Sequence, residues 1–323
     1  MRPSRQYLHK PLRADIARAS LRLGTYTLIV LSVLLGTSFL VFSLGYLTGD
    51  PTNTLLPPDT PTEAVNAFRL EQGLDKPFIV QYGLFLRRAI QGNFGMSLRY
   101  REPAFPLVIS RLGASAQLLL LALGLAGILS IGAGLGSAYY AGTPLDSSLR
   151  VGVLIGQALP PFMTAQLLIL MFAVGLQWLP ATGTPSWRGL VLPILATSSF
   201  SVATLTKLLR ASALDVLSQD YIRTAKSKGL SLYWITLKHT LRNALIPMLA
   251  ALSNQINTLI AGTAVVETVF AYPGMGRLLV EAATARDIPL IQAFVSVVAL
   301  FVVITNLVFD ALYLWIDPRL REH

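Results

Sequence analysis

The stretch LGASAQLLLLALGLAGILSIGAGLGSAYYAGTPL, residues 112–145, contains no charged residue between Arg111 and Asp146. A helix needs about 20 mostly apolar residues to cross the roughly 30 Å of hydrocarbon in a bilayer. The stretch is therefore long enough to span a membrane. Glycine recurs at 132, 134 and 136 here, and at 152 and 156 in the next uncharged window, spacings of small residues that favour close approach of helix backbones.

Five further uncharged windows of this kind lie along the chain. They fall between Arg22 and Asp50, Arg150 and Arg188, Arg188 and Lys207, Arg242 and Glu267, and Asp287 and Asp310. The window 189–206 is the weakest, because it has only 18 residues and several hydroxyl side chains. Pro160 and Pro161 should break or kink the helix of the window before it. The sequence thus predicts an all-α membrane protein with six transmembrane helices, the first at 25–47 and five within a core at 111–316.

The composition excludes several classes of site. Hydrophobic residues make up 53% of the chain and charged residues 13%, with a mean hydropathy of +0.59, which does not fit a polar exterior. The chain has no cysteine and only three histidines, in two tails and a loop. The phosphate-binding GxxxxGK[ST] motif and the GxSxG and HExxH motifs are absent. We therefore expect no catalytic residue, no metal site and no bound cofactor in this chain.

The distribution of charge predicts the orientation in the membrane. If the N-terminus is cytoplasmic, the cytoplasmic segments 1–24, 141–150, 207–242 and 316–323 hold 16 Lys+Arg and 6 Asp+Glu. The outer segments then hold 10 basic and 9 acidic residues. Because basic residues concentrate on the cytoplasmic side of membrane proteins, this places both the basic tail 1–24 and the C-terminus 317–323 in the cytoplasm.

The segment 48–110 is then the one sizeable extracytoplasmic insert. Thr60 as N-cap, Pro61, Glu63 and a stop at Gly73 predict a first short helix. A second amphipathic stretch, 78–90, ends before Gly92. It could lie on the membrane surface or form an ordinary packed loop.

The longest internal cytoplasmic loop, 207–242, has too regular a pattern for a linker. Leu214, Leu217 and Tyr221 recur at helical spacing, which predicts a short helix with an apolar stripe that Gly229 ends. A second basic helix is expected from about Leu232 to Asn243. The loop could be a solvated basic segment, or its first helix could dock onto a soluble partner.

Charge inside the predicted spans is nearly absent, since only Asp310 lies within one. Ion-driven transporters usually carry acids or bases at membrane depth, so an ion-coupled secondary transporter or a channel is disfavoured. An intramembrane enzyme would need paired catalytic groups at matching depth, and none is visible. If solute crosses through this chain, the energy should come from another subunit.

The sequence DYIRTAKSKG, 220–229, followed by LRNALIP, 241–247, resembles the EAA loop of permease subunits of binding-protein-dependent ABC importers, in the dipeptide, oligopeptide and nickel branch. Other matching segments follow in the same order as in that family: GLDKPFIVQYG (73–83), GNFGMSLRYREP (92–103), WLPATG (178–183), VETVFAYPGMGRLL (266–279) and NLVFDALYLWIDPRLR (306–321). The chain departs from the family pattern at Arg223 and Thr224, which stand at the glutamate and first alanine positions, and in its basic N-terminal extension.

The resemblance implies a six-span permease of type I ABC importer architecture in the inner membrane of a prokaryote. It also implies four partner subunits of three kinds: a second related permease, two ATPase subunits that bind ATP and Mg, and an extracytoplasmic solute-binding protein. In the family the EAA loop contacts the ATPase, and this chain's matching contact residues are Leu217, Asp220, Tyr221, Ile222, Arg223, Thr224, Ala225 and Gly229.

Two matters stay open at this level. Thr263 and Glu267 lie at the outer end of the fifth span and could face the outer mouth of the pathway, although packing or capping is an equal alternative for Glu267. The branch carries di- and oligopeptides, nickel chelates and some oligosaccharides. We expect di- or oligopeptides, the usual solutes of the branch.

Overall fold

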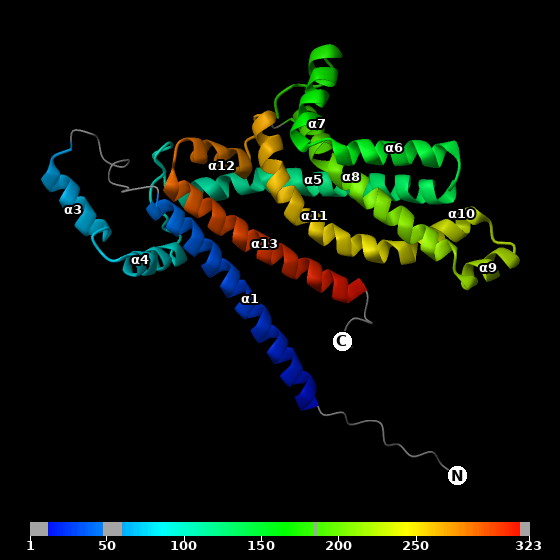
Figure 1. Cartoon of the computed structure of the whole chain (residues 1–323), viewed down its shortest axis with the longest axis horizontal. Helices are drawn as coiled ribbons and strands as arrows, with labels where there is room; N and C mark the ends of the chain where they lie inside the picture. The colour runs from blue at the N-terminus through cyan, green and yellow to red at the C-terminus, as the bar shows by residue number, and fades with distance from the viewer. Residues whose placement is uncertain (1–11, 48–59, 184–185, 317–323) are drawn as a thin grey trace, which may run out of the picture.

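The computed structural model describes residues 12–47, 60–183 and 186–316. The tail before Leu12 and the C-terminus 317–323 lie outside these ranges. The described parts are built of helices joined by short turns (Figure 1). The elements are α1 (Leu12–Leu47), α3 (Thr62–Gln72), α4 (Phe78–Ile90), α5 (Ala104–Tyr139), α6 (Pro144–Ala158), α7 (Pro161–Leu168), η1 (Ile169–Gly175), α8 (Trp187–Leu217), α9 (Asp220–Ser227), α10 (Leu232–Trp234), η2 (Ile235–Thr240), α11 (Leu241–Val269), α12 (Met275–Thr284) and α13 (Ile288–Ile316).

The described helices account for the six predicted spans. Four helices, α1, α5, α8 and α13, are long and apolar enough to cross a membrane, and two bent pairs raise the number to six if each pair is one span. The bent pairs are 144–158 with 161–175, and 235–260 with 262–269. Each of the six uncharged windows corresponds to one of these units.

The helix bounds differ from the predicted ones. Helix α5 begins at Ala104, before Arg111, and α8 continues past Lys207 to Leu217. The predicted second basic helix does not end at Asn243, because α10, η2 and α11 follow one another without a break from Leu232. Charges mark where side chains leave the lipid, whereas backbone hydrogen bonding continues beyond that point.

Helix α8, the weakest window in the sequence, is the central helix of the bundle. Its most apolar stretch is 56% buried, whereas that of α1 is not buried at all. Helices α5, α6, α7 and α11 surround it. Hydroxyl side chains of α8 are buried here; Ser201 donates to Gln255 of α11 at 3.0 Å, and Ser198 donates to the Leu195 carbonyl. Among the hydroxyls that weakened the hydropathy signal, Ser201 therefore links α8 to α11, whereas the buried hydroxyls of Thr197 and Thr206 have no hydrogen-bond partner among the described residues.

Two of the five predicted packing glycines bring backbones close to α8. A Cβ on Gly134 would lie 3.0 Å from Leu209 Cβ, and one on Gly156 would lie 3.2 Å from Ala203 Cβ. Added Cβ atoms on Gly132, Gly136 and Gly152 would meet nothing within 4 Å. The pattern of small residues thus predicted which helices approach each other closely, but not which glycines lie at the contacts.

The predicted break at Pro160 and Pro161 is confirmed. Helix α6 ends at Ala158, and α7 begins at Pro161, with an angle of 108° between the two halves. Figure 1 shows α7 leaving the bundle almost at right angles to α5 and α6. Proline lacks the N–H that would continue the ladder, so the chain can change direction here.

The insert contains the two predicted helices, α3 and α4. Helix α3 begins at Thr62 with Pro61 at the N-cap position, so the predicted cap at Thr60 is wrong by one residue, whereas Gly73 ends the helix in the left-handed conformation as predicted. Helix α4 packs aromatic rings on α1, with Tyr82 and Phe42 centroids 5.5 Å apart. The opposite face of α4 stays exposed, so it can still lie on a membrane surface.

Candidate functional sites

The loop 207–242, which the charge distribution predicts to be cytoplasmic, consists of two separate helical parts. Helix α8 ends at Leu217, Ser218 and Gln219 form a turn, and α9 begins at Asp220. The predicted stripe through Leu217 and Tyr221 therefore does not lie on one helix. Leu217 is half-buried and packs with the core cluster around Leu209, while α9 turns away as a separate short helix. Figure 1 places α9 and α10 at the end of the bundle opposite α12.

Helix α9 presents most of its surface outward. Ile222 is its only buried residue and anchors it to the bundle. Ala225 is half-buried. The remaining predicted contact residues of α9 are exposed: Asp220, Tyr221, Arg223 and Thr224. Arg223 and Asp220 form an ion pair at 3.5 Å, but both side chains are solvent-exposed, so the pair adds little stability.

Gly229 ends α9 as the sequence predicts. Its φ is +79°, in the left-handed region that glycine favours. Its N–H donates to the Lys226 carbonyl at 2.9 Å, and the Leu230 N–H reaches back to the Ala225 carbonyl at 3.3 Å. This arrangement closes the C-terminus of the helix and aims the chain toward α10.

One hydrogen bond connects α9 directly to the helix that re-enters the membrane. The Asn243 side-chain amide of α11 donates to the Tyr221 hydroxyl at 3.1 Å and to the His239 carbonyl at 3.1 Å. Beside this contact Tyr233 and Trp234 are exposed by 60% and 56%. A displacement of α9 would therefore also displace the first turn of α11.

A buried ion pair, which the sequence analysis did not identify, lies close to this loop. Asp146 is 1% exposed and accepts two hydrogen bonds from the Arg210 guanidinium of α8, each at 2.9 Å. It also accepts from the Ser137 hydroxyl and the Gly142 N–H. The pair joins the turn between α5 and α6 to α8, two to three turns before α9. No sequence signal marks it, because Asp146 and Arg210 are far apart in the chain.

The predicted outer residues Thr263 and Glu267 are both buried in α11. Glu267 accepts from the Ser115 hydroxyl at 2.6 Å and from the backbone N–H of Arg277 at 3.1 Å, so its carboxylate caps the first turn of α12. A Cβ on Gly274 would lie 2.3 Å from the Glu267 carboxyl group. These contacts favour the capping alternative for Glu267.

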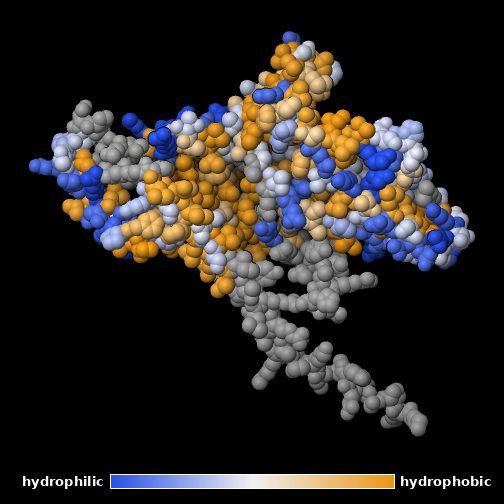
Figure 2. All heavy atoms as spheres, viewed as in Figure 1, coloured by the Kyte–Doolittle hydropathy of each residue, from blue (hydrophilic) through white to orange (hydrophobic). Residues whose placement is uncertain are grey.

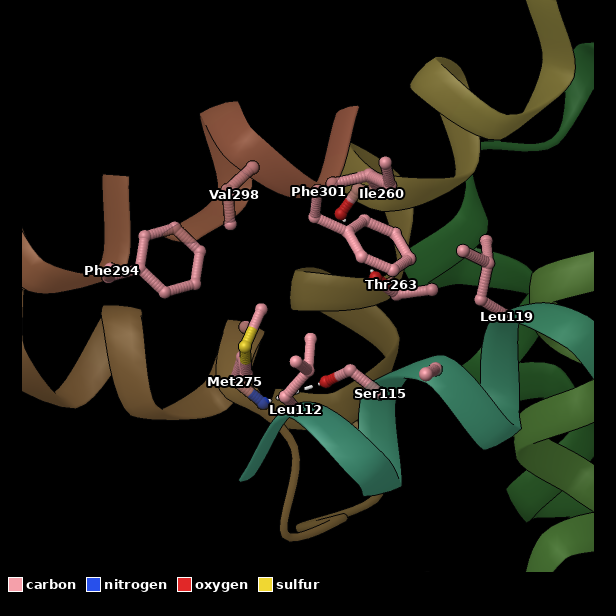
Figure 3. A pocket seen from close by; sticks show the side chains of 11 residues that line it. Leu112, Ser115, Leu119, Ile260, Thr263, Met275, Phe294, Val298 and Phe301 are labelled. Carbon is pink, nitrogen blue, oxygen red and sulfur yellow. Dashed lines mark hydrogen bonds between the residues drawn. The ribbon is translucent and has the colours of Figure 1, made fainter. Parts of the chain in front are cut away.

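A mostly apolar pocket lies beside this cap, between α5, α11, α12 and α13 (Figure 3). Ser115 reaches across its floor and accepts from the Met275 N–H at 2.7 Å. Thr263 points into the same space, and Phe294 and Phe301 line the α13 side. Its few polar atoms are already used in hydrogen bonds within the chain.

A second cluster, around Asp287 and Glu281, joins the insert to the core. Asp287, which is buried, accepts from the Ser97 hydroxyl and from the Leu290 N–H at the start of α13. Nearby, Tyr100 donates to Glu281 of α12, and Arg277 donates to the same carboxylate at 2.9 Å. Partial burial alone would raise the pKa of Glu281, but the hydrogen bonds from Tyr100 and Arg277 outweigh burial and lower it below its usual value.

Among the described residues, no group of three or more His, Asp or Glu side chains is placed to hold a metal ion. The buried carboxylates found here, Asp146, Glu267 and Asp287, are each satisfied by donors from the chain itself. Each of these carboxylates therefore links separate segments of the chain.

The chain is similar to known membrane permeases. The family of inner membrane components of binding-protein-dependent transport systems matches residues 130–322. A peptide permease protein of Brucella suis biovar 1 (strain 1330) is 38% identical over 308 residues, which cover 91% of this chain and 97% of that protein. The glutathione transport system permease protein GsiC of Escherichia coli (strain K12) is 37% identical over 295 residues, covering 91% and 95%. A chain in the crystal structure of an amino acid ABC transporter with histidines is 19% identical in sequence, with a TM-score of 0.45. The match covers 66% of the present chain and 94% of the transporter chain. The chain belongs to the family of inner membrane permease components of binding-protein-dependent ABC transport systems.

Proposed function

We propose that this permease subunit forms half of a pathway that imports di- or oligopeptides. The observation that supports the choice of solute is that relatives matching about nine-tenths of the chain are named for peptides and for glutathione, itself a tripeptide. A solute-binding protein delivers the peptide from outside, and two ATPase subunits supply the energy through ATP and Mg. A second, related permease subunit completes the pathway.

The ATPase docks on α9 at the cytoplasmic end of the bundle. Four of the contact residues expected there, including Tyr221 and Arg223, are already exposed. Ile222 anchors the short helix to the bundle, and Gly229 ends it in the left-handed conformation. The link from Tyr221 to Asn243 then passes movement of α9 into α11.

The solute-binding protein docks at the opposite end, on the insert 60–110 and the turn around Pro273. The excess of basic residues on the α9 side supports this orientation, with both termini in the cytoplasm of a prokaryotic cell and the chain in its inner membrane. Cross-linking tests it: Arg99 should cross-link to the binding protein, and cross-links from Arg99 to the ATPase would show that the orientation is inverted.

Reconstitution tests the function. The complete complex in proteoliposomes should take up a labelled di- or tripeptide only when ATP, the ATPase subunits and the binding protein are all present. Uptake that an ion gradient alone drives would contradict the proposal. Uptake of a nickel chelate or an oligosaccharide, with no competition from peptide, would support the importer function but contradict peptides as the solute.

A further inference from the structure

One face of α11 is more polar than the exposed faces of α1 and α13 in the part of the chain that the structure describes. Six exposed residues of this helix lie at spacings of three, four and seven: Asn243, Pro247, Asn254, Thr258, Val265 and Thr268. At 100° per residue all six fall within about 40° of Asn254. The helix has 29 residues and bends by 48° between residues 260 and 262, so that Val265 and Thr268 lie beyond the bend. The six residues, called the α11 stripe below, lie on both sides of this bend.

Four of the six residues of the α11 stripe are asparagine or threonine, which do not suit contact with lipid, whereas Pro247 and Val265 are apolar. The exposed residues of α1 and α13 are large and apolar, for example Leu40 and Leu44 on α1 and Leu300 and Ile304 on α13. Figure 2 shows hydrophilic residues across the middle of the molecule, where α11 lies, beside apolar surface over α13. Polar side chains at membrane depth normally face protein or a water-filled cavity.

Several polar groups along the α11 stripe can accept or donate hydrogen bonds that the chain itself does not supply, so water or a polar ligand can bind them. Pro247 has no N–H, so the carbonyl of Asn243 lacks its normal helical donor. The Asn254 amide makes no hydrogen bond to any of the described residues with a placed side chain. The Thr258 and Thr268 hydroxyls donate to backbone carbonyls of their own helix, at 3.5 and 2.7 Å. Their oxygens can still accept.

We propose that the α11 stripe is the wall that this subunit contributes to the solute pathway, with Asn254 and Thr258 binding the backbone of the passing peptide. This proposal rests on the proposed function. A side-chain amide has a donor and an acceptor, which match the C=O and N–H of a peptide group, and the threonine oxygen adds an acceptor. The pair carries no charge, so it can bind backbones whatever the peptide side chains are. At its cytoplasmic end, the stripe reaches Asn243 and its bond to Tyr221 of α9.

The other candidate occupant is the second permease subunit, because small and polar residues also mediate helix packing in membranes. Two features favour the pathway. The α11 stripe continues from one end of the helix to the other, and it includes a freed carbonyl that a packed neighbouring helix would have to satisfy. Thr263 and Glu267, by contrast, lie on the opposite face of α11 and are buried within this chain.

Cysteine labelling tests the proposal, and the natural chain has no cysteine, so each introduced thiol is the only one in this subunit. In the complete complex, Asn254→Cys and Thr258→Cys should react with a small charged, membrane-impermeant thiol reagent, either without nucleotide or with ATP. Alanyl-alanine or glutathione, presented with the binding protein, should slow the reaction severalfold. Leu300→Cys and Ile304→Cys on α13 are the matched lipid-facing controls and should stay unreactive.

Uptake kinetics provide a second readout. Asn254→Ala and Thr258→Val should raise the KM for peptide uptake while the complex assembles normally. If peptide uptake is intact but both thiols stay unreactive in each nucleotide state, or form cross-links to the second permease subunit, the stripe is an interface and the proposal is wrong. If the thiols react and another solute protects them while peptides do not, the pathway assignment holds and the proposed peptide solute fails.

Discussion

Replacing Gly229 with valine should uncouple ATP hydrolysis from transport without unfolding the protein. An added Cβ at Gly229 would meet no atom within 4 Å, so the structure offers no steric clash. The whole cost comes from the φ of +79°, which costs a residue with a side chain about 1–2 kcal/mol and is worse for a β-branched one. An energy of about 1–2 kcal/mol shifts a two-state equilibrium by a factor of about 5–30, enough to redirect α9.

The assay is peptide-stimulated ATP hydrolysis by the complete complex in proteoliposomes, together with the amount of complex in the membrane. Gly229→Val should abolish the stimulation and leave the amount unchanged. Gly229→Asn should lose less, because asparagine tolerates the left-handed region. Gly136→Val is the matched control in the membrane, since its Cβ would also meet nothing within 4 Å, and it should behave as the natural protein.

Tyr221 extends the same test to the surface of α9. Tyr221→Ala removes both the exposed ring and the hydroxyl that accepts from Asn243, and it should also abolish the stimulation. Tyr221→Phe keeps the ring and should retain part of it. Normal stimulation in both Gly229→Val and Tyr221→Ala would refute the reasoning, because the segment 213–236 would then be only a basic loop.

Three further predictions concern the carboxylates Asp146, Glu267 and Glu281, which link segments of the chain at the two ends of the bundle. Asp146→Ala should destabilise the protein by about 3 kcal/mol, the lower end for a broken buried ion pair because the Arg210 side chain is 24% exposed; Asp146→Ala with Arg210→Met should melt at a higher temperature than Asp146→Ala alone. Glu267→Gln should cost about 1–3 kcal/mol, because glutamine has one acceptor oxygen, whereas the Glu267 carboxylate accepts from Ser115 at one oxygen and from the Arg277 N–H at the other; a fall in uptake with unchanged thermal stability would instead favour the outer mouth of the pathway. The folded pKa of Glu281 lies below its unfolded value of about 4.3, so the hydrogen bonds to the ionised carboxylate stabilise the folded protein fully above a pH of about 4.3. This stabilisation is lost as the pH falls through the folded pKa. Limited proteolysis of the insert should therefore accelerate in acid, and Tyr100→Phe should weaken this pH dependence; an identical pH profile in the variant would count against the role of this bond.

The sequence alone identified the spans, because an uncharged apolar run of sufficient length has few alternatives in a bilayer. It also located the break at Pro160 and the end of α9 at Gly229. These are local consequences of a missing N–H and of a missing side chain, so neighbouring residues suffice to predict them. The charge asymmetry of the loops is equally a property of the sequence.

The tertiary structure decided which face of each helix is buried. Hydropathy ranked 189–206 lowest, yet α8 is the central helix, because some of the hydroxyls that weaken an apolar signal find partners such as Gln255 once the helices pack. The Asp146–Arg210 pair depends on two residues that meet only after three helices have assembled. In α11, Glu267 and Asn254 look alike in sequence as polar residues near or within a span. Packing alone placed one under α12 and the other on the open face, because burial depends on neighbours that are distant in the chain.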